Sequence, residues 1–453
     1  MHETTLHETV LHETAAIRLF VMAPGPLIRY RGVAIGYSGT GALPRSTLLR
    51  SPILPHFFAP MRRVPNVSAP GLPPLWLTRA LCLSALLLAL GAGTAAHAQL
   101  RPLEVGAEIR SAAGTTGDLP FWLAANRYGT VDPESANLGL RLHAHRPFAG
   151  TGRVDYAFGV ELLGRASERS TLHAHQLYGQ VRVRPFEVTA GLKRHTSGLV
   201  DSVLSMGSTT RSANAAPIPR ISVAFPEYRS IPGTDGYLAI RGYFAHGWLP
   251  TDRYVRSAYL HEKYAYLRVF PERMPIQLHG GFIHNVIWGG THPTLGSLPQ
   301  GLDEYLRVVT GQPGDPANAP DQDVAGTLGN TTAAYDFAVT LQTDLVHLQA
   351  YRQFYLEDRP GLAFRNVWDG LWGLSLQRPG SDHLVSRLLW EHLRMTRQGA
   401  RFSAGEARGA DNYYNNGIYR GGWTYRGRTI GSPLLFADGI RPGVVNNLVV
   451  AHH

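Results

Sequence analysis

Apolar and polar residues alternate with a period of two over much of the chain beyond residue 100. In the segment Arg153–Leu162, one face carries only apolar residues: Val154, Tyr156, Phe158, Val160 and Leu162. The opposite face is polar or small, with Arg153, Asp155, Ala157, Gly159 and Glu161. Successive side chains of a β-strand point to opposite faces, so this alternation predicts strands.

Similar segments recur along the chain and are bounded by turn residues. The predicted strands cover residues 138–145, 153–162, 177–184, 188–193, 236–247, 258–270, 276–287, 333–343, 346–356, 370–377 and 384–394. Many contain about ten residues, more than the roughly five or six of soluble sheets and close to the roughly 9–11 that cross a bilayer. Pro271–Pro275 and Arg378–Asp382 predict hairpin loops.

The two faces of these strands differ in chemistry. One face is apolar and aromatic, and the other holds Arg, Glu, Gln and His, which is the pattern of an outer-membrane barrel. A soluble β-sandwich or β-propeller is the alternative, but the chain has no blade-length repeat. A closed barrel also leaves no backbone group unpaired in lipid. We therefore predict an all-β fold, an antiparallel outer-membrane β-barrel, without a transmembrane helix.

Two long segments do not alternate. Thr196–Ser230 is rich in Ser, Asn, Pro and Gly, and Gly289–Thr332 is rich in Gly, Pro and Asp. Within the second, Gly301–Val309 has apolar spacing that predicts one short helix. Long irregular segments in a regular protein are often functional. In a barrel we expect them to be lumen plugs or extracellular loops.

The first hundred residues differ from the rest. Trp76–Ala98 has an arginine, a short apolar run and an Ala-His-Ala cleavage site, which predicts a secretory signal peptide. Residues 1–75 carry a short repeat around His-Glu-Thr and then proline-rich text, and we interpret them as a non-native, disordered extension, with Met61 as a better start. The mature barrel domain would then comprise residues 99–453.

Composition excludes several classes of function. The single cysteine, Cys82, lies in the signal peptide, so the mature part has no thiol nucleophile or thiolate metal site. The chain has a formal charge of +10, but basic residues are mixed with acidic ones and form no polybasic run, so nucleic acid binding has no support. We expect no cofactor and no metal.

Several segments resemble the Wzi family of capsule-assembly proteins, over nearly all of residues 100–453. They are Phe121–Gly129, Gly198–Ser205, Arg211–Arg220, Tyr259–Lys263, Gly280–Gly290, Asp411–Tyr419 and Gly422–Tyr425. The resemblance implies an outer-membrane barrel of 18 strands that acts as a lectin and not as an enzyme. It implies a protein that binds and anchors exported capsular polysaccharide at the cell surface during capsule assembly.

Several expectations follow from this resemblance. The partners would be capsular or extracellular polysaccharide and outer-membrane lipid, and the protein would be a monomer. Because similar sequences continue beyond His453, we expect the closing strands of the barrel to be missing at the C-terminus. A general outer-membrane porin or channel is the alternative function. No G-x-S-x-G motif supports a serine hydrolase, and the adjacent Glu357 and Asp358 would point to opposite faces of a strand.

Glycan binding needs flat rings for sugar faces and polar groups for hydroxyls, and arginine suits anionic capsules. The residues that combine these properties are Arg211, Asn214, Arg220, Trp288, Tyr413, Tyr414, Asn415, Tyr419 and Trp423. The plainer alternative places the aromatics in an interfacial girdle and the Asn-rich text in a turn.

Pairs of histidines could hold a metal if their strands were neighbours. His143 and His145 form one pair, and His173 and His175 another. We instead expect these side chains, together with those of His261 and His284, to face the polar lumen of the barrel.

Overall fold

The computed structural model describes residues 103–114, 118–148, 150, 152–357, 359–380, 383–399, 411–437 and 449–453. The predicted signal peptide and the preceding extension lie outside the described residues. Among the helices that are described, none is both long and apolar enough to cross a membrane.

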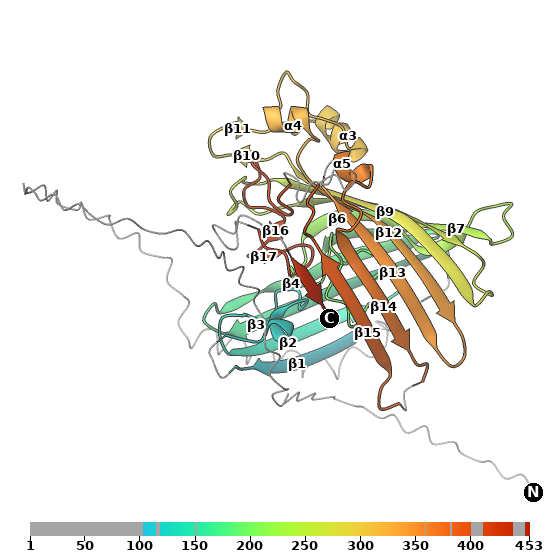
Figure 1. Ribbon diagram of the computed structural model, residues 1–453. Coiled ribbons are helices and arrows are strands. Elements are labelled where there is room, and N and C mark those ends of the chain that lie inside the picture. The colour runs from blue at the N-terminus through green and yellow to red at the C-terminus, as the bar shows by residue number, and fades with distance from the viewer. Residues whose placement is uncertain are drawn as a thin grey trace, which may run out of the picture. The chain divides into compact units, whose positions relative to one another are not determined.

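One antiparallel sheet of fourteen strands dominates the described part of the chain. Its strands are β1 (Glu104–Ala112), β2 (Asn137–Arg146), β3 (Val154–Ala166), β4 (Thr171–Val183), β5 (Phe186–Leu192), β6 (Pro219–Ser230), β7 (Leu238–Trp248), β8 (Tyr259–Val269), β9 (Ile276–Trp288), β12 (Asn330–Gln342), β13 (His347–Leu356), β14 (Gly370–Gln377), β15 (Arg387–Arg394) and β18 (Val450–His452). In Figure 1 the strands follow one another in chain order around a strongly curved sheet.

Within the described residues the sheet does not close, because β1 and β18 each pair on one side only. The resemblance implied 18 strands, and fourteen are seen here in the main sheet. Connections at the two ends of the strands differ in length. At one end they are short, as between β4 and β5 or between β12 and β13. At the other end they include all the long segments: 113–136, 193–218, 289–329 and 395–449.

The two faces of the sheet have the predicted chemistry. On β3, Val154, Tyr156, Val160 and Leu162 are exposed on the outer face, whereas Glu161 is buried on the inner face. The outer face of the other strands is also exposed and apolar, and it includes Ile240, Phe244, Leu267, Leu278, Phe337, Val339, Leu374 and Leu388. This arrangement confirms the fold class of an outer-membrane β-barrel sheet.

The alternation predicted most strands correctly, and the residues 370–377 match β14 without any shift. The predicted hairpin at Pro271–Pro275 does connect β8 to β9. The prediction that Thr196–Ser230 is irregular throughout was wrong, because its last part forms β6. Pro226 disguised that strand: it lies within an irregularity in the β6–β7 pairing, between Phe225 and Arg229, and a proline inside a run argues against a strand.

Short elements complete the described structure. They are α2 (Phe121–Ala124), α3 (Leu302–Thr310), α4 (Asp321–Ala325), α5 (Arg359–Leu362), the two-stranded pair β10 (Thr291–His292) and β11 (Gly296–Ser297), and the pair β16 (Thr424–Tyr425) and β17 (Arg428–Thr429). The helix predicted at Gly301–Val309 is therefore confirmed as α3. It ends at Gly311, whose φ of 67° is the left-handed conformation in which glycine terminates helices.

Candidate functional site

Residues 196–218 lie inside the sheet, and together with residues 411–437 we name them the plug. Buried side chains of three strands, β12, β13 and β15, hold the first plug segment. The Asp336 carboxylate of β12 accepts the Leu199 amide at 2.7 Å, and the Glu391 carboxylate of β15 accepts the Met206 amide at 2.7 Å. The Gln353 side chain of β13 accepts the Thr209 amide at 3.0 Å. Of the two alternatives for this segment, a lumen plug or an extracellular loop, residues 196–218 form the plug.

A charged contact adds to these anchors. Arg387 of β15 donates to the Asp201 carboxylate at 2.9 Å, and the Ser375 hydroxyl of β14 donates to the same group at 2.5 Å. Arg211 of the plug lies 3.4 Å from Glu262 of β8, and both side chains are buried. Burial lowers the pKa of Arg211, while the Glu262 carboxylate opposes that shift. The interior is therefore filled by specific polar contacts between plug and wall.

The second plug segment docks on the first. The Trp423 indole donates to the Thr210 carbonyl at 2.9 Å, and the Ser212 amide donates to the Ile430 carbonyl at 2.9 Å. The Tyr413 hydroxyl donates to the Asp369 carboxylate at 2.9 Å. Burial raises the pKa of Tyr413 well above the ordinary value of a tyrosine. The two segments thus form one continuous interior layer.

The structure brings most of the nine predicted glycan-binding residues together inside this layer. Fully or almost fully buried are Arg211, Asn214, Arg220, Tyr413, Tyr414, Tyr419 and Trp423. Asn214 donates to the Thr429 carbonyl at 3.1 Å, and Arg220 donates to the Lys193 carbonyl at 2.8 Å. Asn415 is half-buried. In this conformation the buried side chains support the plug, and their contact with a glycan remains a prediction.

Trp288 lies apart from the other eight predicted residues, on the outer face of β9. It lines a pocket of about 420 Å³ together with His246, Trp248, Tyr259, Gln300, Gly301, Leu302 and Tyr305. The Trp288 and Tyr305 rings are stacked with centroids 5.4 Å apart. We name this the rim pocket, because Trp248 and Trp288 end their strands at the side of the long connections.

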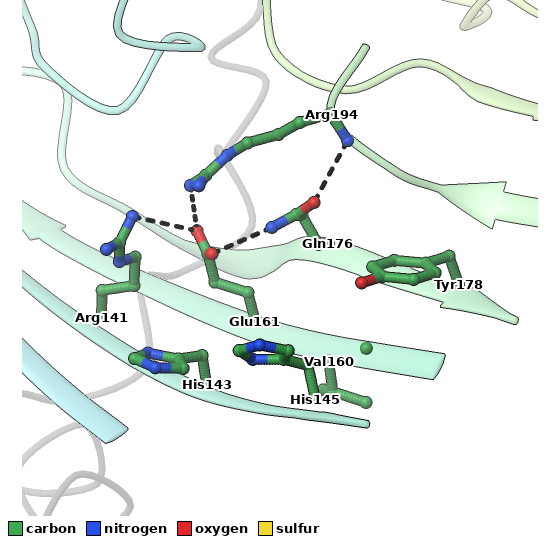
Figure 2. A pocket seen from close by; sticks show the side chains of 9 residues that line it. Arg141, His143, His145, Val160, Glu161, Gln176, Tyr178 and Arg194 are labelled. Carbon is green, nitrogen blue, oxygen red and sulfur yellow. Dashed lines mark hydrogen bonds and ion pairs between the residues drawn. The ribbon is translucent and has the colours of Figure 1, made fainter. Parts of the chain in front are cut away.

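A second pocket, of about 240 Å³, lies on the inner wall halfway along β2, β3 and β4. We name it the wall pocket, and it is lined by Arg141, His143, His145, Gly159, Val160, Glu161, Gln176, Tyr178 and Arg194. Figure 2 shows the Glu161 carboxylate at its centre, between the guanidinium groups of Arg141 and Arg194. Almost all of the lining side chains are polar.

The contacts of the wall pocket fix its side chains. Arg194 donates to Glu161 at 2.6 Å through its guanidinium group and to the Gln176 side chain at 3.1 Å through its backbone amide. Gln176 in turn donates to Glu161 at 3.1 Å. Arg141 lies 3.9 Å from Glu161. Arg141 also pairs with the Glu108 carboxylate of β1, so two guanidinium groups meet two carboxylates here. The remaining N–H donors of the guanidinium groups give the pocket capacity for a carboxylate- or hydroxyl-bearing ligand.

Sequence reasoning did not single out Arg141, Gln176, Tyr178 or Arg194. Gln176 and Tyr178 fall at polar positions in or next to a predicted strand. Predicting that they cluster with residues of other strands requires the strand register, which aligns His143 with Glu161 and Glu161 with Gln176. His143 and His145 do line the inner wall, as predicted. The described residues contain no group of three or more side chains suited to a metal ion.

The prediction that His261 and His284 face the lumen was wrong. Their neighbours in sequence, Glu262 and Ile283, face the interior, so these histidines point outward. His261 contacts the Tyr305 ring of α3, with centroids 5.7 Å apart. The helix α3 therefore packs on the outer side of the wall. Leu298, in the segment 289–329 that carries α3, instead belongs to the interior apolar cluster with the plug residues, so only the part around α3 is shown to lie outside.

The chain was compared with known proteins. The family described as "Capsule assembly protein Wzi" matches residues 111–435. Among solved structures, the chain is similar to Wzi from Escherichia coli, described as an outer-membrane protein involved in group 1 capsule assembly and a carbohydrate-binding β-barrel. The identity is 17%, the coverage is 81% of this chain and 70% of that chain, and the TM-score is 0.43.

More distant likeness extends to a mutant porin of Rh. blastica, with 9% identity, coverage of 58% of this chain and 87% of that chain, and a TM-score of 0.27. No match was found among curated protein sequences. The family match spans more than half of the chain and includes the wall pocket, the rim pocket and all of the plug except its last two residues. This chain belongs to the Wzi family of capsule assembly proteins.

Proposed function

We propose that this protein lies in the outer membrane, binds exported capsular polysaccharide there without catalysing a reaction, and holds it at the cell surface during capsule assembly. Membership of a capsule-assembly family supports the choice of ligand. The apolar outer face of the sheet supports the location. The observation that carries the proposal is the plug, which strand side chains hold inside the wall at Asp336, Gln353 and Glu391.

A general porin is the alternative function, and it needs an open lumen. The anchored plug disfavours that function, because opening a channel would break several buried hydrogen bonds at once. A planar-bilayer recording of the full-length protein distinguishes the two. We expect no steady large conductance. Large, steady single-channel currents would contradict the binding function and support the porin.

The wall pocket is the surface that we propose for saccharide contact. Arg141 and Arg194 suit a sugar carboxylate, since a guanidinium group pairs with carboxylates in a bidentate manner. Gln176 and His145 supply hydrogen bonds for hydroxyl groups, and the Tyr178 ring offers a flat face. The long connections at the rim are the other surface that a polysaccharide could meet.

The nine residues predicted from the sequence enter this proposal in two ways. Asn415 is proposed as a direct contact, because it is half-buried. Trp288 is 2% exposed and is proposed to act indirectly, by supporting the rim pocket that it lines. The seven buried residues are proposed to act indirectly, by holding the plug that shapes the interior. The double substitution Tyr413→Ala and Tyr414→Ala should therefore reduce both glycan binding and plug stability, and reduced binding with an unchanged plug would contradict the indirect role.

Binding to an acidic capsular polysaccharide, measured by pull-down and by titration of the detergent-solubilised protein, tests the proposal. Loss of one charge-assisted hydrogen bond is worth about 1.5–3 kcal/mol, so Arg141→Gln should weaken binding by about tenfold or more. Arg169→Gln is the control, because Arg169 is an exposed residue that pairs with Glu134 away from the wall pocket. If neither variant changes a measurable affinity, the rim becomes the contact surface; no binding to any polysaccharide would overturn the function.

A further inference from the structure

The helix α3 packs on the outer face of the wall, on the opposite side from the plug. The strand β9 shows this directly, because its residues alternate between two separate apolar clusters. Ile283 and Ile287 belong to the large interior cluster with the plug residues. Val286 and Trp288 belong to a smaller cluster with Val308 of α3 and Leu328. Adjacent residues of a strand point to opposite faces, so α3 and the plug lie on different sides.

The wall beneath α3 is unusually polar for an outer face. His261, Lys263 and His284 all point outward there, and the Lys263 ammonium group donates to the Val309 carbonyl of α3. His261 is fully buried although it lies outside the barrel wall. Bare polar groups in a hydrocarbon environment cost several kcal/mol each. The helix covers these side chains and separates them from the surroundings of the wall.

The helix itself is amphipathic, and its apolar stripe is wider than the surface that it packs with. Tyr305 and Val308 form one flank of the stripe and pack against the wall. Leu302 and Leu306, one turn apart, occupy the other flank and remain 73% and 54% exposed. On the opposite side of the helix, Glu304 accepts from Asn318 at 2.8 Å and Arg307 pairs with Asp315 at 3.2 Å. The helix thus has a wall side, a polar side and an uncovered apolar side.

The exposed side of α3, with Leu302 and Leu306, continues the apolar outer face of the sheet. Trp248 and Leu302 line the rim pocket together, and Trp248 is an exposed residue at the end of β7. Further along β7, Phe244 and Ile240 extend the same outward face toward the short turns. Tryptophan and tyrosine gather where a membrane meets water, and the rim pocket contains Trp248, Trp288, Tyr259 and Tyr305.

From these observations we propose that α3 is an interfacial helix, which inserts Leu302 and Leu306 into the acyl boundary of the lipid leaflet that surrounds the long connections. Those connections mark the extracellular side in outer-membrane barrels, so the leaflet is the outer one. The polar side, with Glu304 and Arg307, faces the headgroups and water. The occupant of this surface is lipid, and the helix also shields His261, Lys263 and His284 from it.

Site-directed fluorescence in lipid vesicles tests this placement. In a Cys82→Ala background the chain has no other cysteine, so Leu302→Cys and Leu306→Cys each give one site for an environment-sensitive probe. Asp303→Cys, on the polar side of the same helix, is the matched water control. Phe244→Cys, on the outward face of β7, is the matched lipid control. All four positions are at least partly exposed, so the substitutions do not disturb a core.

In phosphatidylcholine vesicles that contain a lipid-borne quencher, we expect the probes at positions 302 and 306 to be quenched like the probe at 244. That quenching should be about twofold or more above that at 303, because an interfacial helix buries its apolar face by about 5–10 Å. Aqueous iodide should give the reverse order. The placement is overturned if both the lipid-borne quencher and iodide quench the probes at positions 302 and 306 to the same extent as the probe at 303, while the probe at 244 is still quenched from the lipid. Water or another macromolecule would then cover positions 302 and 306.

Discussion

Removing the indole of Trp423 should release the plug without unfolding the wall. The side chain is 0% exposed, and its indole nitrogen donates to the Thr210 carbonyl at 2.9 Å. Truncation of a buried tryptophan to alanine costs about 3–5 kcal/mol, and the Thr210 carbonyl loses its partner in addition. Both losses fall on the contact between the two plug segments, so they destabilise the docked plug relative to a released one.

A destabilisation of about 4 kcal/mol raises the population of the released plug by about a thousandfold, since each 1.4 kcal/mol is a factor of ten. Amide hydrogen exchange of the detergent-solubilised Trp423→Ala protein measures this population. The amides of Thr209 and Ser212, which now donate to Gln353 and to the Ile430 carbonyl, should exchange correspondingly faster. Amides in the pairing of β7 with β8 should be unchanged.

Trp390→Ala is the matched control, because Trp390 is a half-exposed tryptophan on the outer face of β15. Its removal should leave exchange of the plug amides as in the unaltered protein. Two results would refute the reasoning: plug amides in Trp423→Ala that exchange at the original rate, or strand amides that accelerate as much as plug amides. The first would mean that the two segments are not coupled through Trp423, and the second that plug and wall unfold together.

Two further predictions concern buried charge. Glu262→Gln should destabilise the protein by about 3–5 kcal/mol in thermal unfolding, because Arg211 is left buried without its partner. Adding Arg211→Met should recover part of this loss. If the effects of the two substitutions on the unfolding free energy simply add, the two side chains do not interact. Burial raises the pKa of Asp323 from 3.8 to about 7, equivalent to about 4 kcal/mol. The Asp323 carboxyl ionises at lower pH in the unfolded segment than in the packed one, so packing of residues 302–329 should weaken as pH rises from about 4 to about 7. Hydrogen exchange of this segment measures the effect, and an equal pH dependence in the unaltered protein and in Asp323→Asn would contradict it.

Local alternation was sufficient to predict most of the wall, because each transmembrane strand meets lipid on one side and a polar interior on the other. β1 could also have been found: Val105, Ala107 and Ile109 alternate there with polar or small residues. β6 could not be found in this way, since Pro226 and an irregular pairing interrupt its alternation. An irregularity in strand pairing interrupts the period-two alternation of apolar and polar residues, and with it the pattern that predicts a strand.

The side of the wall on which an irregular segment packs is a long-range property. The apolar spacing of residues 301–309 correctly predicts a helix, but the same stripe could face a plug or an outer wall. What decides the side is the register of β9, which directs Val286 and Trp288 away from Ile283 and Ile287. The prediction for His261 and His284 failed for the same reason, because the outward polar residues of β8 and β9 are covered by a helix from elsewhere in the chain.

Residue types alone cannot separate a sugar-binding surface from the core of a plug in a polar lumen. Both need rings with a polar tip, which explains why Tyr413, Tyr414 and Trp423 matched a glycan site. What distinguishes the two is the partner of each polar tip. Here the Tyr413 hydroxyl contacts Asp369, the Tyr414 hydroxyl contacts the Thr209 carbonyl, and the Trp423 indole contacts Thr210. These tips already have partners within the protein, so a glycan that bound them would have to displace the plug's own hydrogen bonds.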